Sequence, residues 1–292
     1  MLTEEEYKTE WAAGLHQTDY NNCRFAEDKL AYCKSWLSEY VPSYRNNTYE
    51  FLVTEACNQK IKIAEDLEYR NLCSVWSDKI LVEQQLADIG LSDLIIPSIA
   101  KVKSFTNIQE LIDLQANGDV IIKCNHGSGW NKILRSHDNE ATMQNILSSI
   151  NEWQFLNYAY IGGYEAQYEN IDKGLIIQPM LAESLMDYCF WCINGEIKRI
   201  SLTKKLGKNL ERYIAFVNPD GSASHQCIGM PPELYNLPNS LQQIIESMKE
   251  AVIKIASKFE FVRVDMYHVN GKNYFGETTF TPCGGKLVLS ER

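Results

Sequence analysis

The chain has 292 residues, of which 45% are hydrophobic and 23% are charged, and its formal net charge is −10. These proportions are typical of a globular protein with a buried core. The negative charge argues against nucleic acid or an anionic membrane surface as a partner, although a nucleotide needs only a local cationic pocket.

The apolar runs and the cysteines indicate the cellular compartment of the protein. The longest apolar runs, such as residues 174–181, are too short to cross a bilayer, so we expect no integral membrane segment. The N-terminus is acidic, whereas a signal peptide begins with basic and then apolar residues. Nine scattered cysteines are typical of free thiols in a reducing compartment, and we therefore expect a cytoplasmic protein.

Cys189 and Cys192 alone have the spacing of metal ligands. They lie in a run of strand-forming residues, so their thiols should point to opposite faces of a sheet. No second pair of Cys or His residues completes a zinc site. We interpret both as structural residues.

The first 75 residues predict a mainly helical region, with apolar residues at helical spacing over 5–15 and 24–40. A further helix is predicted over 76–89. Ser77 is its expected N-cap and Gly90 its expected C-cap.

The character of the sequence changes near residue 93, where short apolar runs begin to alternate with helical patterns. A short strand is predicted over 94–97 and a helix over 107–115. A strand over 119–123 leads into a glycine-rich loop, and a helix over 142–158 follows it.

The last 120 residues are rich in predicted strands. Asn194-Gly195 and Asn270-Gly271 are strong signals for tight hairpin turns. The elements predicted here are strands over 175–178, 188–193, 196–202, 261–269 and 272–277, and a helix over 241–259. The chain as a whole therefore predicts an α+β fold with antiparallel sheets.

The first candidate functional segment is the loop that follows the strand over 119–123. Lys123 ends this strand, and Gly127-Ser128-Gly129 follows shortly after. Small residues let backbone N–H groups approach phosphate oxygens, and a lysine supplies a point charge. The segment is not a Walker A loop, because Gly-Lys-Ser/Thr is missing. An ordinary surface loop is the alternative.

The second candidate is a pair of carboxylates in the last predicted hairpin. Asp265 and Arg263 are two residues apart, so they face the same side of their strand, and Phe275 and Glu277 should also share a face. The antiparallel hairpin can bring Asp265 and Glu277 together. With a hydroxyl such as that of Thr279, they suit a hard cation like Mg²⁺. Charge on a solvated sheet face is the alternative.

The third candidate is the strand end at Gln178 with Met180 and Leu181, followed by Asp187. Backbone groups left free at such a strand end can bind an adenine edge, and a nearby carboxylate can bind ribose hydroxyls. A simple strand end followed by a loop is the alternative, and the segment alone favours it.

The order of these segments resembles the ATP-grasp superfamily, including the D-alanine–D-alanine ligases, whose last motif also begins Arg-x-Asp. The closer resemblance is to the TupA-like ATP-grasp family, which is associated with teichuronopeptide and other surface-polysaccharide biosynthesis. It covers roughly residues 70 to 285, and its last motif is the most specific. The segments that carry it are Ser77-Asp78-Lys79, residues 122–129, Asp187-Tyr188 with Asn194-Gly195, and residues 261–267 with 275–280.

The resemblance implies a role for each candidate residue. Lys123 would bind the α- and β-phosphates of ATP, and the loop from Gly127 through Ser128 to Gly129 would cover the triphosphate as a mobile lid. The further implied sites are adenine at Gln178, Met180 and Leu181, ribose at Asp187, Mg²⁺ at Asp265, Glu277 and Thr279, and the acyl-phosphate at Arg263.

Two positions depart from the family pattern. Relatives have a second cation five residues after Asp78, where this chain has Glu83, and Lys101 or Lys103 is the candidate substitute. Many relatives have Asn where this chain has Thr279. Both departures put full catalytic activity in question.

The resemblance implies an ATP-grasp fold in which two α+β subdomains clasp ATP. We expect a helical N-terminal region over 1–75, an N-terminal subdomain with the glycine-rich lid over 76–172, and a C-terminal subdomain with the metal site over 173–292. The implied cofactors are ATP and Mg²⁺.

The implied activity is carboxylate–amine ligation through an acyl-phosphate. The ligase would attach an amine or amino acid to a uronic acid, either small or part of a glycan, in capsule or cell-surface polysaccharide biosynthesis. A phosphotransferase acting on a sugar or small molecule and a catalytically weak ATP-binding protein are the alternatives. For the oligomeric state we consider a homodimer.

Overall fold

The computed structural model describes residue 34 and residues 50–160, 164–206, 211–221, 223–228 and 240–285. The helices predicted over 5–15 and 24–40 lie outside the described residues, apart from Lys34. The described residues form two units, one made of 60–85 and 96–180 and the other of 50–59, 86–95 and 181–285. Helices α3 (Glu50–Glu65) and α5 (Val82–Asp88) contribute residues to both.

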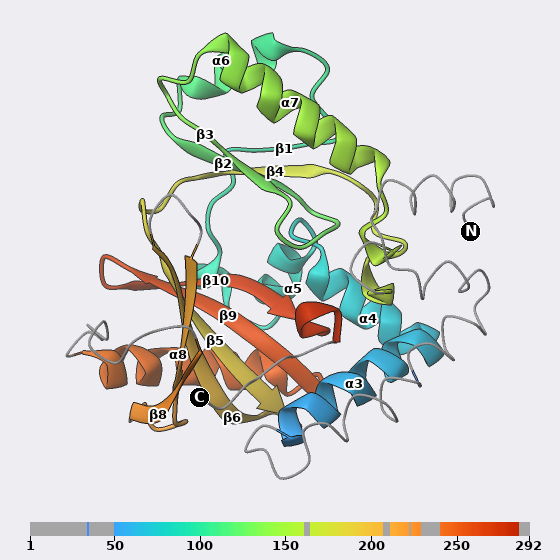
Figure 1. Cartoon of the computed structure of the whole chain (residues 1–292), viewed down its shortest axis with the longest axis vertical. Coiled ribbons are helices and arrows are strands. Elements are labelled where there is room, and N and C mark those ends of the chain that lie inside the picture. The colour runs from blue at the N-terminus through green and yellow to red at the C-terminus, as the bar shows by residue number, and fades with distance from the viewer. Residues whose placement is uncertain are drawn as a thin grey trace. The chain divides into compact units, whose positions relative to one another are not determined.

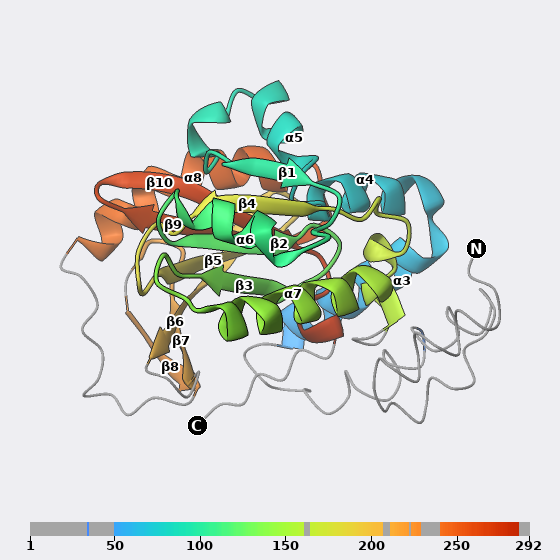
Figure 2. The ribbon, with the colours of Figure 1, turned by 90° about the horizontal axis from the view of Figure 1, so that it is seen from above.

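The first unit contains a four-stranded antiparallel sheet in the order β1-β4-β2-β3, with two helices on one face (Figures 1 and 2). Its elements, besides parts of α3 and α5, are α4 (Leu67–Ser77), β1 (Ala100–Val102), α6 (Ile108–Gln115), β2 (Val120–Cys124), β3 (Asn131–Leu134), α7 (Glu140–Phe155), η4 (Tyr158–Tyr160), η5 (Ala166–Tyr168) and β4 (Leu175–Pro179).

The core of this unit lies between the sheet and helices α6 and α7. Alternate residues of β2, such as Val120 and Ile122, pack with Leu147 and Ile150 of α7, and all four are buried. The opposite alternation places Ile121 and Lys123 on the other face of the sheet. Core packing therefore determines which face Lys123 occupies.

The second unit contains a six-stranded antiparallel sheet in the order β10-β9-β5-β6-β7-β8, and α8 lies along it (Figure 1). Its elements, besides parts of α3 and α5, are η3 (Ser92–Leu94), β5 (Met186–Ile193), β6 (Glu196–Leu206), β7 (Glu211–Val217), β8 (Ala223–Ile228), α8 (Leu241–Ala256), β9 (Phe261–Val269), β10 (Lys272–Thr279) and η7 (Pro282–Gly285).

Both predicted Asn-Gly turns are confirmed. Asn194 and Gly195 have φ values of 50° and 78°, and Asn270 and Gly271 have 52° and 78°. Two consecutive residues with positive φ match the right-handed twist of the flanking strands, and Asn and Gly adopt this conformation most easily. These turns set the β5–β6 and β9–β10 hairpins, which carry the candidate residues Asp187, Arg263, Asp265, Glu277 and Thr279.

Two predicted elements differ from the structure. Trp76 and Ser77 end α4 instead of beginning a helix, because the carboxylate of Asp78 accepts the N–H groups of Ile80 and Leu81 and caps the next turn instead. The strand predicted over 94–97 is also absent from the described structure, and the strand of that region is β1, which pairs with β4.

The helix over 107–115 is confirmed, with Asn107 as its side-chain N-cap. Gly90 has a φ of +73°, as a glycine following a helix end often has. In the described part of the chain, no helix is long and apolar enough to cross a membrane.

Candidate active site

Four of the predicted residues meet on one face of the β9–β10 hairpin. The Arg263 guanidinium donates from Nε to Asp265 Oδ1 at 2.7 Å and from Nη2 to Asp265 Oδ2 at 2.5 Å. The same Nη2 lies 3.1 Å from Thr279 Oγ1 and 3.7 Å from Glu277 Oε1. Thr279 Oγ1 in turn lies 3.4 Å from Glu277 Oε1. The prediction that Asp265 and Glu277 come together is therefore confirmed.

The strand pairing that places Glu277 beside Asp265 differs from the prediction. Phe275 pairs with Met266 and Glu277 pairs with Asp265, so one extra residue, Gly276, bulges between them. Directly paired residues share a face, so Phe275 and Glu277 lie on opposite faces and the predicted shared face is wrong. Strict alternation would place Glu277 on the face opposite Asp265.

Strand β5 supplies the neighbours of this cluster. Cys189 is paired with Asp265 and Trp191 with Arg263, so both lie on the same face as the cluster. The Arg263 guanidinium carbon is 5.5 Å from the centre of a Trp191 ring, and Trp191 Nε1 donates to Ser201 Oγ. Cation–π contact and the paired carboxylate together fix the guanidinium.

Burial changes the ionisation of this face. Asp265 is only 5% exposed, and burial raises the pKa of its carboxyl, while the Arg263 guanidinium acts against that rise. Burial also raises the pKa of the Cys189 thiol well above its ordinary value. Cys189 is therefore a neutral thiol, and Cys192 faces away from it, as predicted for structural cysteines.

Asp187 lies on the same face of the sheet as Asp265, since it pairs with Tyr267, two residues further along β9. Its charge contributes to raising the pKa of the Tyr267 hydroxyl, after burial, which is the largest cause. Asp187 is half-buried. The predicted ribose ligand and the predicted metal ligands thus belong to one sheet face.

The donor set has the chemistry of a magnesium site. Two carboxylates and a hydroxyl offer oxygen atoms, which Mg²⁺ prefers, and Mg²⁺ usually takes only one or two carboxylates and completes its shell with water and phosphate oxygens. Within the described residues, no three His, Cys, Asp or Glu side chains are grouped to bind a metal. The residues therefore fit a two-carboxylate magnesium site that also needs ligand oxygens.

The first unit brings together Lys123 and Gln178. Lys123 Nζ lies 2.9 Å from Gln178 Oε1, and Gln178 Nε2 donates to Ile96 O at 3.2 Å. Gln178 is buried, and its side chain is thus held by contacts at both ends. Met180 N donates to Asp119 O, so this N–H is not free for a ligand, and Leu181 is half-buried.

Lys101 lies on the same sheet face as Lys123, because both pair with Ile176 of β4 from opposite sides. Its ammonium forms an ion pair with Glu83, and Lys103 pairs instead with the exposed Asp172. One carboxylate oxygen of Glu83, Oε1, is buried without a hydrogen-bond partner in the described structure. The position five residues after Asp78 therefore carries a glutamate that holds Lys101 beside it.

The glycine-rich loop has a fixed base and an exposed tip. Asn125 and His126 are each 1% exposed and Gly127 is buried, whereas Ser128 is half-buried and Gly129 is exposed with a φ of +73°. Burial lowers the pKa of His126 to about 4. At neutral pH the imidazole is uncharged and supplies no positive charge for phosphate, and its ring nitrogens contact Asn125 and Trp153 O.

Comparison with known proteins identifies the family. The family described as TupA-like ATPgrasp matches residues 58–292. The chain belongs to the TupA-like ATP-grasp family. The expected α+β ATP-grasp fold is thereby confirmed. A search of curated proteins found no match.

Solved structures that resemble this chain include members of several ATP-grasp groups. D-alanine–D-alanine ligase from Bacillus anthracis is 17% identical, with a TM-score of 0.39, and the match covers 70% of this chain and 57% of that one. D-alanyl-alanine synthetase A from Vibrio cholerae is 13% identical, with a TM-score of 0.42, covering 78% and 57%. N5-carboxyaminoimidazole synthetase from Staphylococcus aureus, complexed with ADP, is 13% identical, with a TM-score of 0.41, covering 71% and 45%. The chain thus matches about half the length of these proteins.

Sequence reasoning missed some residues that the structure joins to the site. Trp191 packs on Arg263, and its strand position two residues after Cys189 could have placed it there. Asn125 makes hydrogen bonds that hold the base of the loop, and nothing in its local sequence indicates this role. Its contacts come from segments about 47 residues away in both directions.

Proposed function

We propose that this protein is an ATP- and Mg²⁺-dependent ligase that joins a carboxylate to an amine through an acyl-phosphate. The cluster of Arg263, Asp265, Glu277 and Thr279 on one sheet face carries this proposal, in a chain of the ATP-grasp family. Hydroxide is a poor leaving group, so a carboxylate must be activated before an amine can replace its oxygen. Transfer of the γ-phosphoryl group of ATP provides that activation.

In this proposal, Asp265, Glu277 and Thr279 hold Mg²⁺. The metal would neutralise charge on the β- and γ-phosphates during transfer. Arg263 is placed beside the same oxygens and would stabilise the oxyanion that forms when the amine attacks. Its contacts with Asp265 and Trp191 support this role, because a guanidinium held in place needs little rearrangement during the reaction.

The nucleotide would be bound by the other predicted residues. Lys123 supplies positive charge for the α- and β-phosphates, and Lys101, held by Glu83 on the same sheet face, is proposed as the second cation. Leu181 is proposed to meet adenine together with Gln178 and the Met180 side chain, and Asp187 to bind the ribose. The exposed tip formed by Ser128 and Gly129 would cover the phosphates and exclude water.

We propose a uronic acid, free or within a glycan, as the carboxylate and an amino acid or simple amine as the acceptor. This part rests on the surface-polysaccharide role that the sequence resemblance implies. The six cysteines whose side chains the structure describes are free thiols, in keeping with the proposed cytoplasmic location.

Calorimetric titration with Mg²⁺-ATP tests the nucleotide site. Wild type should bind Mg²⁺-ATP, and Glu277→Gln should lose most of the Mg²⁺ dependence while keeping the Arg263–Asp265 pair intact. Asp265→Asn/Glu277→Gln should lose all of it. Glu196→Gln/Glu246→Gln is the matched control, because it removes two exposed carboxylates of the same unit. If wild type binds no Mg²⁺-ATP, the proposed function is wrong.

Product analysis tests the reaction. A ligase releases ADP and phosphate only when a carboxylate and an amine are both present. Release of ADP with a phosphorylated sugar and no amine requirement would show a phosphotransferase instead. Binding of Mg²⁺-ATP without turnover across uronic acids and amino acids would favour a catalytically weak ATP-binding protein.

A further inference from the structure

The motif Ser77-Asp78-Lys79 has no part in the proposed site, yet the structure joins it to the glycine-rich loop. Asp78 is 3% exposed, and its Oδ1 accepts Ile80 N at 2.8 Å and Leu81 N at 3.2 Å. The same oxygen accepts Asn125 Nδ2 at 3.0 Å. Asp78 therefore links the turn after α4 to the first residue of the loop.

Asn125 is fixed from a third direction as well. Its Nδ2 also donates to Asp172 O at 2.9 Å, and its Oδ1 accepts Gly174 N at 2.7 Å. Its own backbone N–H donates to Gly174 O. A buried amide with this many partners has one orientation, because any rotation leaves a buried polar group unpaired.

Lys79 reaches the loop two residues further on. Its ammonium donates to the carbonyl oxygen of Gly127. Gly127 is packed so closely that an added Cβ would lie 2.8 Å from a Trp130 ring carbon and 2.9 Å from a Tyr158 ring carbon. Glycine is therefore required here for close packing, and the lysine holds this packed residue from its carbonyl side.

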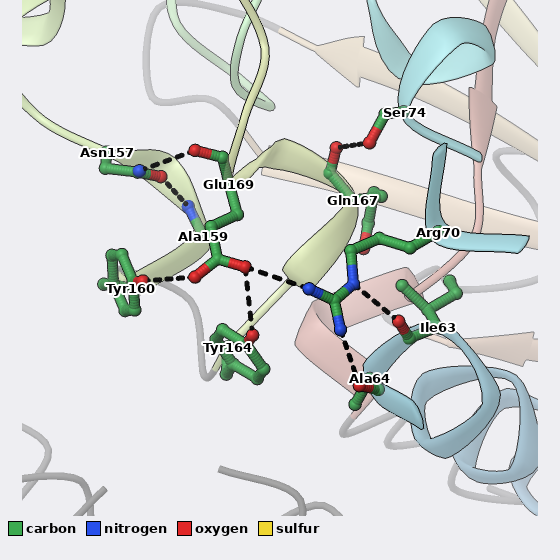
Figure 3. A network of polar contacts seen from close by, with 10 residues as sticks. All are labelled: Ile63, Ala64, Arg70, Ser74, Asn157, Ala159, Tyr160, Tyr164, Gln167 and Glu169. Atoms are coloured by element: carbon green, nitrogen blue, oxygen red, sulfur yellow. Dashed lines mark hydrogen bonds and ion pairs between the residues drawn. The ribbon is translucent and has the colours of Figure 1, made fainter. Parts of the chain in front are cut away.

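Helix α4, which precedes Lys79, and the segment around Tyr158 are joined by the polar contacts that Figure 3 shows. The Arg70 guanidinium of α4 donates to Ile63 O, Ala64 O and the Glu169 carboxylate. Glu169 also accepts the hydroxyls of Tyr160 and Tyr164. Helix α4, which ends at Ser77, is thus tied to residues 157–160 and 164–169, so both supports of the loop belong to one framework.

We propose that Asp78 and Lys79 are positioning residues that anchor the base of the glycine-rich loop, from Asn125 to Gly127. Only the tip, Ser128 and Gly129, is then left to adjust to a phosphate ligand. The identity of the ligand at the tip rests on the proposed function, whereas the anchoring of the loop base is a property of the free protein. A loop held at its base loses less conformational entropy on binding, which favours nucleotide affinity.

The test compares Lys79→Met, Lys79→Arg and Asp78→Asn with wild type in two measurements. The first is amide hydrogen exchange of the free protein, resolved for the peptide that contains residues 124–131. We expect Lys79→Met to exchange about tenfold faster there, as the loss of one charge-assisted hydrogen bond implies, with helix α7 unchanged. Lys79→Arg should restore most of the protection. Lys198→Met, which removes an exposed lysine elsewhere, is the control.

The second measurement is the Kd for Mg²⁺-ATP. Lys79→Met and Asp78→Asn should each raise it about tenfold, and Lys79→Arg should bring it back towards the wild-type value. Unchanged exchange of residues 124–131 in Lys79→Met overturns the inference, and so does equally faster exchange throughout the unit, which would show a role in general stability. Failure of wild type to bind Mg²⁺-ATP overturns the proposed function instead, while the exchange result still decides the anchoring.

Discussion

Glu277 lies directly opposite Asp265 on the β9–β10 hairpin because Gly276 bulges out of the strand pairing. A Cβ atom on Gly276 would lie 2.9 Å from Asp265 O and 3.0 Å from a ring carbon of Tyr267. The bulge therefore needs glycine, and the position of one proposed metal ligand depends on the residue beside it.

Gly276→Ala should move Glu277 away from Asp265. We expect a loss of about 1–3 kcal/mol in the free energy of unfolding, because the neighbour that must give way is backbone. Mg²⁺-dependent ATP binding should fall together with stability. Urea unfolding and calorimetry measure the two effects. Lys272→Ala, at the exposed start of the same strand, is the control, and equal effects of both substitutions would contradict the role of the bulge.

Arg263 and Asp265 should behave as a coupled pair. Arg263→Met leaves a buried carboxylate without its partner and should lower the free energy of unfolding by about 3 kcal/mol. Adding Asp265→Asn to that variant should recover part of the loss, because the unpaired charge is then gone. A double-mutant cycle from urea unfolding measures the coupling. Strictly additive losses would show that the two side chains act independently.

Glu169 should stabilise the framework shown in Figure 3. Glu169→Gln keeps the shape of the side chain but removes the charge facing Arg70, whose side chain is 16% exposed. We expect a cost of about 1–3 kcal/mol in the free energy of unfolding. Glu196→Gln removes a carboxylate from an exposed ion pair and should cost much less, because solvent screens that pair. Similar costs for the two variants would contradict this prediction.

His126 should make stability depend on pH in mildly acidic solution. Burial lowers its pKa to about 4 from the ordinary histidine value of 6.5, so between these values the unfolded chain binds the proton that the folded chain excludes. Stability should therefore fall as the pH drops from 6.5 towards 4, by an amount on the order of 3 kcal/mol for this residue.

Unfolding free energies of wild type and His126→Gln between pH 4 and 7.5 test that dependence. The variant should be less stable at neutral pH, because Gln cannot reproduce the imidazole contacts with Trp153 O and Asn125. The unfolding free energy of the variant should depend less steeply on pH between 4 and 6.5. A slope equal to that of wild type would mean that other groups produce the acid sensitivity.

Local chemistry made much of the fold predictable. Asn270-Gly271 indicated a tight hairpin because few other residue pairs adopt two positive φ values. The spacing of Arg263 and Asp265 was sufficient to place them on one face. These features depend only on residues that are close together in the chain, so they can be predicted from a single sequence.

The sequence by itself determined the hairpins, the α+β class and the resemblance that places the chain in its family. Only the tertiary structure decided that Glu277 and Phe275 face opposite ways, and that the base of the glycine-rich loop is buried and anchored by Asp78 and Lys79. The physical reason is the same in both cases. The bulge is set by how Gly276 packs against Asp265 and Tyr267 of the paired strand, and the buried loop base by contacts with segments about 47 residues away, and residue spacing records neither.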